Sequence, residues 1–185
     1  MKIIFIRHGQ TKGNEEKRYI GRTDEELSYK GIEEIKKRLY PNSDIIYVSP
    51  MKRCIETAKI IYPNSKYIIC NDFRECDFGI FEGKNYDELK NKPDYQNWID
   101  SMGTMPIPQG ESHEQFKTRC CNEFDSIVKT FKGTAALIVH GGTIMAILEK
   151  YAVHKSDFYS YQVKNGCGYV TEFENGKLKI ITELK

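Results

Sequence analysis

The sequence predicts an α/β fold with three layers, in which helices cover both faces of a mostly parallel sheet. Two observations support this prediction. Short, continuous apolar runs, which are typical of strands buried on both faces, alternate along the chain with segments whose apolar residues recur at helical spacing. The clearest runs are Ile3–Ile6 and Ala135–Val139. A chain of 185 residues is expected to fold as one domain with a core of ordinary size.

The N-terminal half of the chain is predicted to hold three strands and two helices. Ser28 is the expected N-cap of the first helix, which should end near Leu39. Ser49 and Pro50 are typical of the N-cap and the first position of the second helix. The polar segment Arg7–Leu27 is expected to be a loop, and loops of more than ~15 residues are usually functional or disordered. The strands are predicted at Lys2–Ile6, Asp44–Val48 and Lys66–Cys70.

The C-terminal half is predicted to begin irregularly and to end in a β-hairpin. Ser112 is the expected N-cap of a long amphipathic helix that ends near Phe131. The pair Asn175-Gly176 is typical of the tight turn of a hairpin. The other helices are predicted at Tyr86–Asn91, Asp94–Met102 and Thr143–Tyr151, and the other strands at Ala135–Val139, Gly166–Phe173 and Leu178–Thr182.

Composition and charge argue against several classes of partner. The net charge of +2 gives no argument for nucleic acid, and no run approaches the ~20 apolar residues that cross a membrane. The apolar run after Lys2 is too short for a signal peptide and is followed by Arg7. The six cysteines form no CxxC pair, so we expect reduced thiols in a cytoplasmic protein. Neither a nucleic-acid partner nor a membrane partner is expected.

Cationic residues and histidines follow the predicted strands. Arg7 and His8 come directly after the first strand, and His140 follows the strand Ala135–Val139. Arg53 lies in the first turn of the helix that follows the second strand. In open α/β sheets ligands bind at the carboxyl edge of the strands, and guanidinium groups bind phosphate oxygens with two parallel hydrogen bonds. If these strands are neighbours, the four side chains converge on a site for an anion such as phosphate.

Each of these residues also has a simpler interpretation. A single histidine at a strand end is more often a hydrogen-bonded structural residue, and a single arginine in a first helical turn is usually solvated. Arg7 is more informative, because a cation at the end of a buried strand seldom lacks a partner. A metal site formed by His8 and His140 is not expected, because two nearby guanidinium groups would repel a cation.

Five segments carry a more specific signal when they are considered together. They are Arg7–Thr11 with Asn14, Gly21–Gly31, Ser49–Ala58, Glu75–Gly83 and Val139–Gly142. In this order they resemble the motifs of the histidine phosphatase superfamily, in its phosphoglycerate mutase-like branch. The resemblance spans nearly the whole chain. It implies a phosphoglycerate mutase-like fold and a single domain over residues 1–185, with residues 71–111 forming an irregular segment that caps the substrate.

The resemblance also implies a reaction and a role for each site residue. His8 would be the nucleophile that forms a phosphohistidine, and Glu75 would protonate the leaving alkoxide and then activate water. Neither a metal nor a cofactor would be needed, because the phosphoryl oxygens would be held by Arg7, Arg53 and His140. The residues implied in substrate binding are Asn14, Gly21, Glu82 and Gly141.

Glu82 is the alternative candidate for the acid. The family that the sequence resembles contains both phosphatases and mutases. Residues 73–115 hold few of the basic residues with which mutases bind a substrate carboxylate, which favours a phosphatase acting on a small-molecule phosphate ester. Glu75–Gly83, the segment around Trp98 and Gly110-Glu111-Ser112 look most similar to the α-ribazole-5′-phosphate phosphatases of cobalamin biosynthesis. The alternatives are a phosphoglycerate mutase and a non-catalytic member that binds phosphorylated ligands or a protein. Monomer and homodimer are both open.

Overall fold

The computed structural model describes residues 1–185 and contains one six-stranded sheet in the order β3-β2-β4-β1-β5-β6. Pairing is parallel between β1 and β4, β2 and β4, and β2 and β3, and antiparallel between β1 and β5 and between β5 and β6. The mostly parallel α/β sheet is therefore confirmed. The strands are β1 (Lys2–Arg7), β2 (Ile45–Val48), β3 (Tyr67–Ile69), β4 (Thr134–Val139), β5 (Gly168–Glu174) and β6 (Lys177–Leu184).

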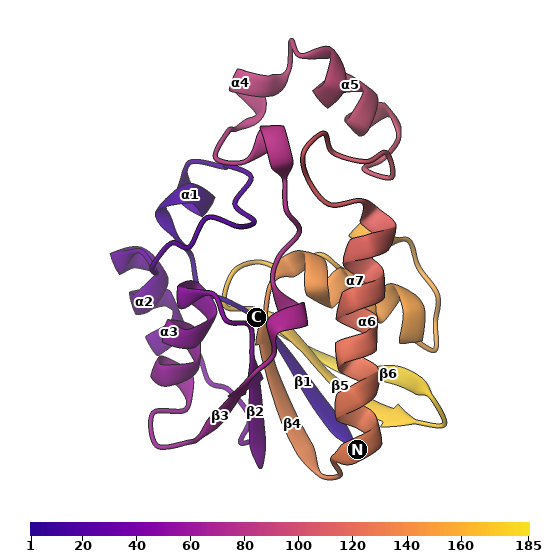
Figure 1. Ribbon diagram of the computed structural model, residues 1–185. Coiled ribbons are helices and arrows are strands. Elements are labelled where there is room, and N and C mark those ends of the chain that lie inside the picture. The colour runs from indigo at the N-terminus through magenta and orange to yellow at the C-terminus, as the bar shows by residue number, and fades with distance from the viewer.

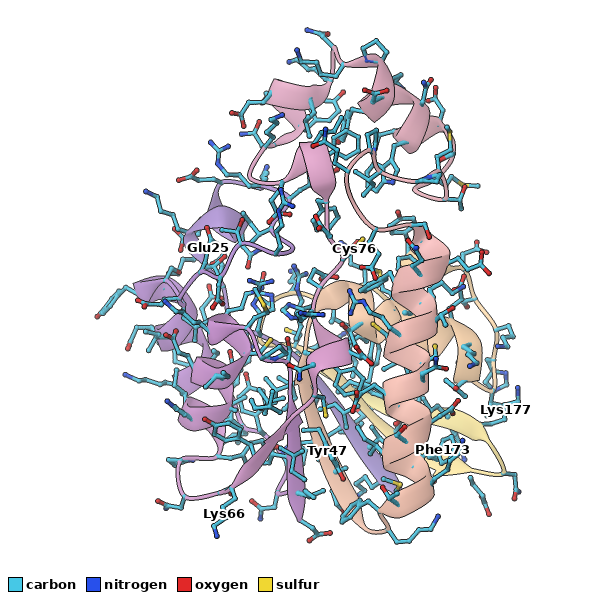
Figure 2. The ribbon with its side chains drawn as sticks, in the orientation of Figure 1. Glu25, Tyr47, Lys66, Cys76, Phe173 and Lys177 are labelled. Carbon is cyan, nitrogen blue, oxygen red and sulfur yellow. The ribbon has the colours of Figure 1, made fainter.

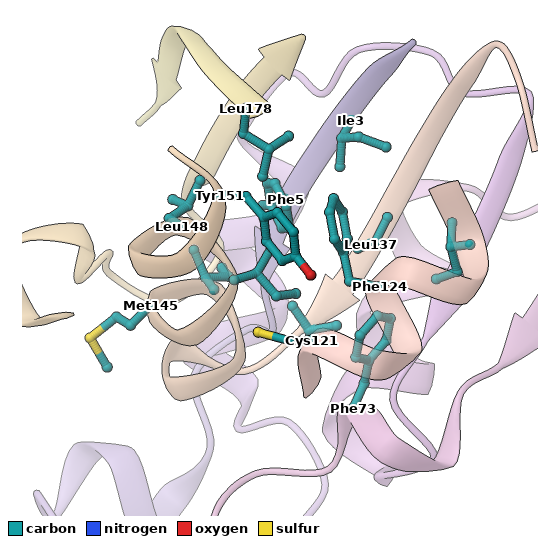
Figure 3. Close-up of a cluster of buried hydrophobic side chains, with 14 of the residues drawn as sticks. Ile3, Phe5, Phe73, Cys121, Phe124, Leu137, Met145, Leu148, Tyr151 and Leu178 are labelled. Carbon is teal, nitrogen blue, oxygen red and sulfur yellow. The ribbon is translucent and has the colours of Figure 1, made fainter. Parts of the chain in front are cut away.

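Helices cover both faces of the sheet (Figure 1). One face carries α3 (Lys52–Ile61) with α2 (Tyr29–Lys36) beside it, and the other carries α6 (His113–Thr130) and α7 (Gly141–Tyr151). Side chains alternate across a strand, so β1 contributes to both cores. Its odd-numbered residues Ile3 and Phe5 join the cluster under α6 and α7 (Figure 3), and Ile4 and Ile6 join the cluster under α3.

Two of the predicted local signals are confirmed. Ser112 caps α6 and forms a reciprocal capping box with Gln115, in which each side chain accepts from the other's backbone N–H. Asn175 and Gly176 both have positive φ, 49° and 74°, as the tight turn between β5 and β6 requires. The apolar helix before this hairpin, α7, begins at Gly141, directly after the strand end that carries His140. No helix combines the length and the apolar composition needed to cross a bilayer.

The prediction that Ser49 caps α3 is wrong. Met51 is the N-cap, and Lys52 is the first residue of the helix. The Ser49 hydroxyl instead lies 2.7 Å from Nε2 of His140, and Ser49 is fully buried. A long-range bond to a buried imidazole therefore takes the place of the local cap.

The predicted loop between β1 and α2 is ordered by local and long-range hydrogen bonds. It contains a short helix, α1 (Lys12–Glu15), which begins with a capping box between Thr11 and Asn14. Within this helix, the backbone N–H of Gly13 donates to the Glu25 carboxylate at 3.2 Å. These bonds fix the segment that carries Asn14 at the carboxyl end of β1.

Residues 71–111 lie between β3 and α6 and contain short helical elements joined by loops. These elements are η1 (Asn71–Phe73), η2 (Gly79–Phe81), α4 (Tyr86–Leu89) and α5 (Pro93–Asp100), and the two α-helices project beyond the sheet (Figure 1). Four buried residues hold these elements together, with Trp98 packed against them: Phe81, Leu89, Tyr95 and Ile107. Figure 2 shows Cys76 on the connection between the sheet and these helices. That this segment caps the substrate stays a prediction.

Candidate active site

The two histidines meet at the carboxyl edge of the sheet because their strands are neighbours. β1 pairs with β4 in parallel, with Arg7 opposite Val139. His8 and His140, the next residues of each strand, therefore stand side by side, with ring centroids 5.1 Å apart and planes at 66°. Both are buried, with 4% and 0% of their surface exposed. The sheet order thus brings together two residues that are 132 positions apart in the sequence.

His8 is held in one tautomer. Its Nδ1 lies 2.7 Å from the carbonyl oxygen of Gly9, and because a carbonyl can only accept, Nδ1 carries the hydrogen. Burial first, and then the charges of Arg53 and Arg7, hold the pKa of His8 well below the usual 6.5. The ring is therefore neutral near pH 7, with an unprotonated Nε2. A neutral imidazole nitrogen of this kind is a nucleophile.

His140 is held in the opposite tautomer. Nε of Arg53 donates to Nδ1 of His140 at 3.3 Å, so Nε2 carries the hydrogen and donates to the Ser49 hydroxyl at 2.7 Å. Burial lowers the pKa of His140 well below its usual value, and Arg53, His8 and Arg7 lower it further. Ser49 thus orients the second histidine, a role that its local sequence does not indicate.

These two neutral histidines are expected to make the protein less stable below about pH 6.5. In the unfolded chain each imidazole binds a proton near pH 6.5, whereas in the folded protein each stays neutral well below that pH. The unfolded state then binds more protons than the folded state. The free energy of unfolding therefore decreases as the pH is lowered, by up to ~1.4 kcal/mol per pH unit for each histidine. Urea denaturation from about pH 7.5 to about pH 5 measures this slope. His8→Asn should have a shallower slope, and an unchanged slope would contradict a neutral His8.

Arg53 is buried rather than solvated, with 1% of its surface exposed. Its Nη2 donates to the carbonyl of Gly21 at 2.9 Å, its Nη1 to the carbonyl of Thr23 at 2.8 Å, and its Nε to His140. A guanidinium has five N–H donors, so two remain free for a ligand. The solvated interpretation is therefore wrong for Arg53.

Replacing Arg53 with lysine is expected to be severely damaging although the charge is kept. An ammonium group has no rigid fork with which to satisfy Gly21, Thr23, His140 and a phosphate at once. Loss of an aligned charge-assisted bond to the transition state costs roughly 2–4 kcal/mol, or ~30- to 1000-fold in rate. Steady-state hydrolysis of p-nitrophenyl phosphate measures the loss. A rate within about threefold of wild type would show that Arg53 makes no such contact.

Arg7 has a buried donor without a partner. Its Nη1 donates to the carbonyl of Val163 at 2.7 Å, but its Nε finds no acceptor. Burial lowers the pKa of Arg7, nearby Glu75 opposes that effect, and Arg53 adds to it. An unsatisfied buried donor costs about 1–3 kcal/mol, a cost that a bound anion removes.

A cavity of about 490 Å³ joins Arg7 to the segment that carries α4 and α5. Its polar end is lined by Arg7, Asn14, Glu75, Gly141 and Gly142, and its other end is lined by aromatic and apolar side chains, among them Tyr19, Phe78, Trp98, Met145, Phe158 and Tyr159. Asn14 reaches the cavity with its Oδ1 accepting from Asn165 at 3.0 Å. Asn165 also donates to the His8 carbonyl at 3.1 Å, which ties Asn14 to the backbone of His8.

Glu75 lines this cavity at the N-terminus of α7. Its Oε2 accepts from the backbone N–H of Gly142 at 3.2 Å, and its Oε1 accepts from the N–H of Cys76 at 3.0 Å. A Cβ at position 142 would lie 2.3 Å from Oε1 of Glu75, so only glycine leaves room for the carboxylate.

Glu82 holds the loop that binds Arg53. Its Oε1 accepts from the backbone N–H groups of Gly21 and Thr23, both at 2.9 Å, and from the Thr23 hydroxyl at 2.7 Å. The carbonyls of the same two residues accept from Arg53. Glu82 does not line the cavity. Of the two candidate acids, only Glu75 therefore has its carboxylate at the cavity.

Arg119 of α6 holds the segment that carries Glu75, and no local sequence signal indicates it. Nη1 donates to the carbonyls of Asp72 and Arg74, both at 2.7 Å, and Nη2 donates to the carbonyl of Glu75 at 3.0 Å. Nε and Nη2 also bind the two oxygens of the Glu111 carboxylate at 2.7 Å each. All five donors of Arg119 are thus used.

Arg119→Ala is expected to reduce the free energy of unfolding by about 2–4 kcal/mol, because it leaves the half-buried Glu111 carboxylate and three carbonyls without a donor. It should also displace Glu75. Urea denaturation and turnover of an alkyl phosphate measure the two effects. Lys117→Ala is the matched control, since it removes an ion pair of the same helix with Glu149 on α7, away from Glu75. Equal losses in both variants would argue against a specific role for Arg119.

Similarity to known proteins decides the family. A model described as "Histidine phosphatase superfamily (branch 1)" matches residues 3–183. This chain belongs to that superfamily. The match covers the strand ends, the helix starts and the Glu75 segment that together build the cavity.

Three relatives of this superfamily member differ in the activity that they are named for. Phosphoserine phosphatase 1 of Hydrogenobacter thermophilus is 26% identical over 191 residues, which cover 98% of this chain and 90% of that protein. The alpha-ribazole phosphatase of Shigella flexneri has a TM-score of 0.88 at 19% identity, over 100% of this chain and 96% of that one. The phosphoglycerate mutase of Thermus thermophilus has a TM-score of 0.77 at 24% identity, over 100% and 99%. Both structures show the fold alone, and it is phosphoglycerate mutase-like, as expected.

Proposed function

We propose that this histidine phosphatase is a phosphomonoesterase that transfers the phosphoryl group of a small metabolite to Nε2 of His8 and then to water. The supporting observation is the state of His8. Its ring is buried and neutral, Nδ1–H is bonded to the Gly9 carbonyl, and the positive charges of Arg53 and Arg7 act on the ring. A structural histidine needs neither a free nitrogen nor two adjacent guanidinium groups.

In the proposed reaction Nε2 of His8 attacks phosphorus as the bond to the leaving oxygen breaks. The protonated Glu75 carboxyl gives its proton to that oxygen. Water then attacks the phosphohistidine, Glu75 takes the proton of the water, and inorganic phosphate leaves. Arg7 and Arg53 stabilise the negative charge of the phosphoryl oxygens throughout, with no metal ion.

His140 acts in this proposal mainly by orienting Arg53. Both of its ring nitrogens are already engaged, with Arg53 and with Ser49. Direct donation from Nδ1 to a phosphoryl oxygen needs a hydrogen on Nδ1, which is present in the other neutral tautomer, where Nε2 accepts from the Ser49 hydroxyl, and in the imidazolium form. A bound dianion favours that form, because it opposes the two guanidinium charges that lower the pKa of His140.

The cavity favours a substrate whose leaving group is aromatic or apolar. Tyr19 and Trp98 stand edge to face with centroids 5.7 Å apart, and Phe78 lies 5.2 Å from Tyr19. Aromatic walls of this kind bind flat rings. We therefore propose α-ribazole-5′-phosphate, and a role in cobalamin biosynthesis, as the first substrate to test. A cytoplasmic location stays a prediction.

The test is a set of phosphate esters assayed in EDTA: p-nitrophenyl phosphate, α-ribazole-5′-phosphate, phosphoserine, and 3-phosphoglycerate with and without a bisphosphate primer. A phosphatase should release inorganic phosphate without primer, and kcat/KM should be highest for α-ribazole-5′-phosphate. Higher kcat/KM for phosphoserine would refute the substrate but leave the phosphatase. Isomerisation of 3-phosphoglycerate without phosphate release would identify a mutase, and no turnover of any ester would favour a non-catalytic binder.

A further inference from the structure

A second cavity, of about 840 Å³, adjoins the active site on the side of α2. Five of its lining residues are cationic and one is acidic, Glu34. One of the cations, Arg7, belongs to the active site. The other four come from three separate segments of the chain: Lys17 from the loop after α1, Lys30 and Arg38 from α2 and its C-terminal end, and Lys164 from the loop before β5.

These four cations are unpaired. The eleven ion pairs of the structure include none of Lys17, Lys30, Arg38 and Lys164, and Glu34 is unpaired as well. Lys30 and Glu34 are four residues apart on one side of α2, and Arg38 follows directly after the C-cap of that helix, Lys37. Lys36, one position off that side, pairs with Glu33 in the ordinary way. Four like charges around one carboxylate repel one another, and an anion bound between them would offset that repulsion.

Besides Nε of Arg7, one further buried donor among the residues that line this cavity lacks an acceptor. It is Nη1 of Arg38. Gly166 leaves the space for the Arg38 guanidinium, because a Cβ there would lie 2.8 Å from Nη1 and φ is +72°. An unsatisfied buried guanidinium N–H is costly, and an oxyanion is its natural acceptor. The charge pattern and the missing acceptors thus indicate the same kind of ligand.

The loop beside this cavity is bonded directly to the nucleophile's strand. Val163 accepts from Arg7, the N–H of Gly166 donates to the carbonyl of Arg7 at 3.0 Å, and Asn165 donates to the carbonyl of His8. Four residues line both cavities: Arg7, Lys17, Gln162 and Asn165. Arg7 therefore belongs to the lining of both cavities.

We propose that this cavity is a second anion-binding site, for an oxyanion that carries several negative charges, such as a triphosphate or a polycarboxylate. Lys17, Lys30, Arg38 and Lys164 hold the ligand, and its charge lowers the positive potential at Arg7. The ligand is separate from the phosphate that reacts with His8. Its chemistry could also belong to a distant anionic group of the substrate itself, and the test separates these two sources.

The test is calorimetric titration of sodium tripolyphosphate into the full-length protein, with and without saturating orthovanadate, which occupies the phosphate site. A separate site predicts binding that persists with vanadate. If the second cavity receives only the far end of a ligand anchored at His8, vanadate should abolish tripolyphosphate binding, and the separate site is refuted.

Substitutions then assign that binding to residues. Arg38→Gln and Lys30→Gln, each in vanadate-saturated protein, should weaken tripolyphosphate binding by about tenfold or more, which is ~1.4 kcal/mol. Lys164→Gln gives a third, independent variant from another segment. Lys36→Gln is the matched control, because it removes a cation of the same helix that lies outside the cavity. Equal affinity in the three cavity variants and the control would overturn the proposal.

Discussion

Replacing His8 with asparagine is expected to abolish turnover of every phosphate ester. The nucleophilic nitrogen is lost. Removal of a nucleophile from a set of catalytic residues that act together typically lowers kcat by ~10⁴-fold or more. Asparagine is chosen because His8 is buried and an amide can still donate to the Gly9 carbonyl. Steady-state phosphate release measures activity, and thermal unfolding confirms that the variant is folded.

The matched control for this variant is Cys54→Ala. Cys54 is fully buried, and its Sγ lies 3.6 Å from Nε2 of His140, so its removal perturbs the same region and leaves the proposed nucleophile, His8, in place. Activity in Cys54→Ala should remain orders of magnitude above that of His8→Asn. Substantial phosphate release by a folded His8→Asn protein would remove His8 from the role of nucleophile.

Glu75→Gln should impair substrates according to their leaving groups. An alkyl phosphate releases a poor alkoxide that needs a proton, whereas p-nitrophenolate leaves without one. The rate at which p-nitrophenyl phosphate phosphorylates His8 should therefore change little, while turnover of an alkyl phosphate falls by ~10²- to 10⁴-fold. Hydrolysis of the phosphohistidine also lacks its base, so the intermediate should accumulate. Pre-steady-state release of p-nitrophenol should show a burst followed by a slow steady rate.

Glu82→Gln provides the comparison that separates the two carboxylates. The Glu82 carboxylate holds Gly21 and Thr23, whose carbonyls bind Arg53. Its loss should weaken phosphate binding for all substrates alike, with no dependence on the leaving group. A burst in Glu82→Gln and none in Glu75→Gln would reverse the assignment of the acid.

The layers of the fold were predictable because their signals are local. Continuous apolar runs identified β1, β2 and β4, and the parallel order of these strands places His8 beside His140. Ser112 caps a helix that begins at the next residue, and Asn175-Gly176 forms the turn between two strands that are adjacent in the chain. Signals of this kind can be evaluated from a short window of sequence.

The parts that could not be predicted depend on partners far away in the chain. Ser49 precedes a proline and matches a helix N-cap, yet its hydroxyl binds a histidine 91 residues away. Glu82 matches a motif, but only its bonds 59 and 61 residues back show that it holds a loop. Arg119 lies on the polar side of an amphipathic helix, where one arginine resembles any other until its acceptors are known.

A phosphohistidine at His8 is the central claim, and trapping this intermediate tests the claim most directly. Wild type, Glu75→Gln and His8→Asn are mixed with ³²P-labelled p-nitrophenyl phosphate, quenched in base or acid within milliseconds, and digested for peptide mapping. We predict a base-stable, acid-labile phosphate on the peptide that contains His8, at low level in wild type, near stoichiometric in Glu75→Gln and absent in His8→Asn. A label on another residue, or no label in Glu75→Gln while p-nitrophenol is released, would contradict it.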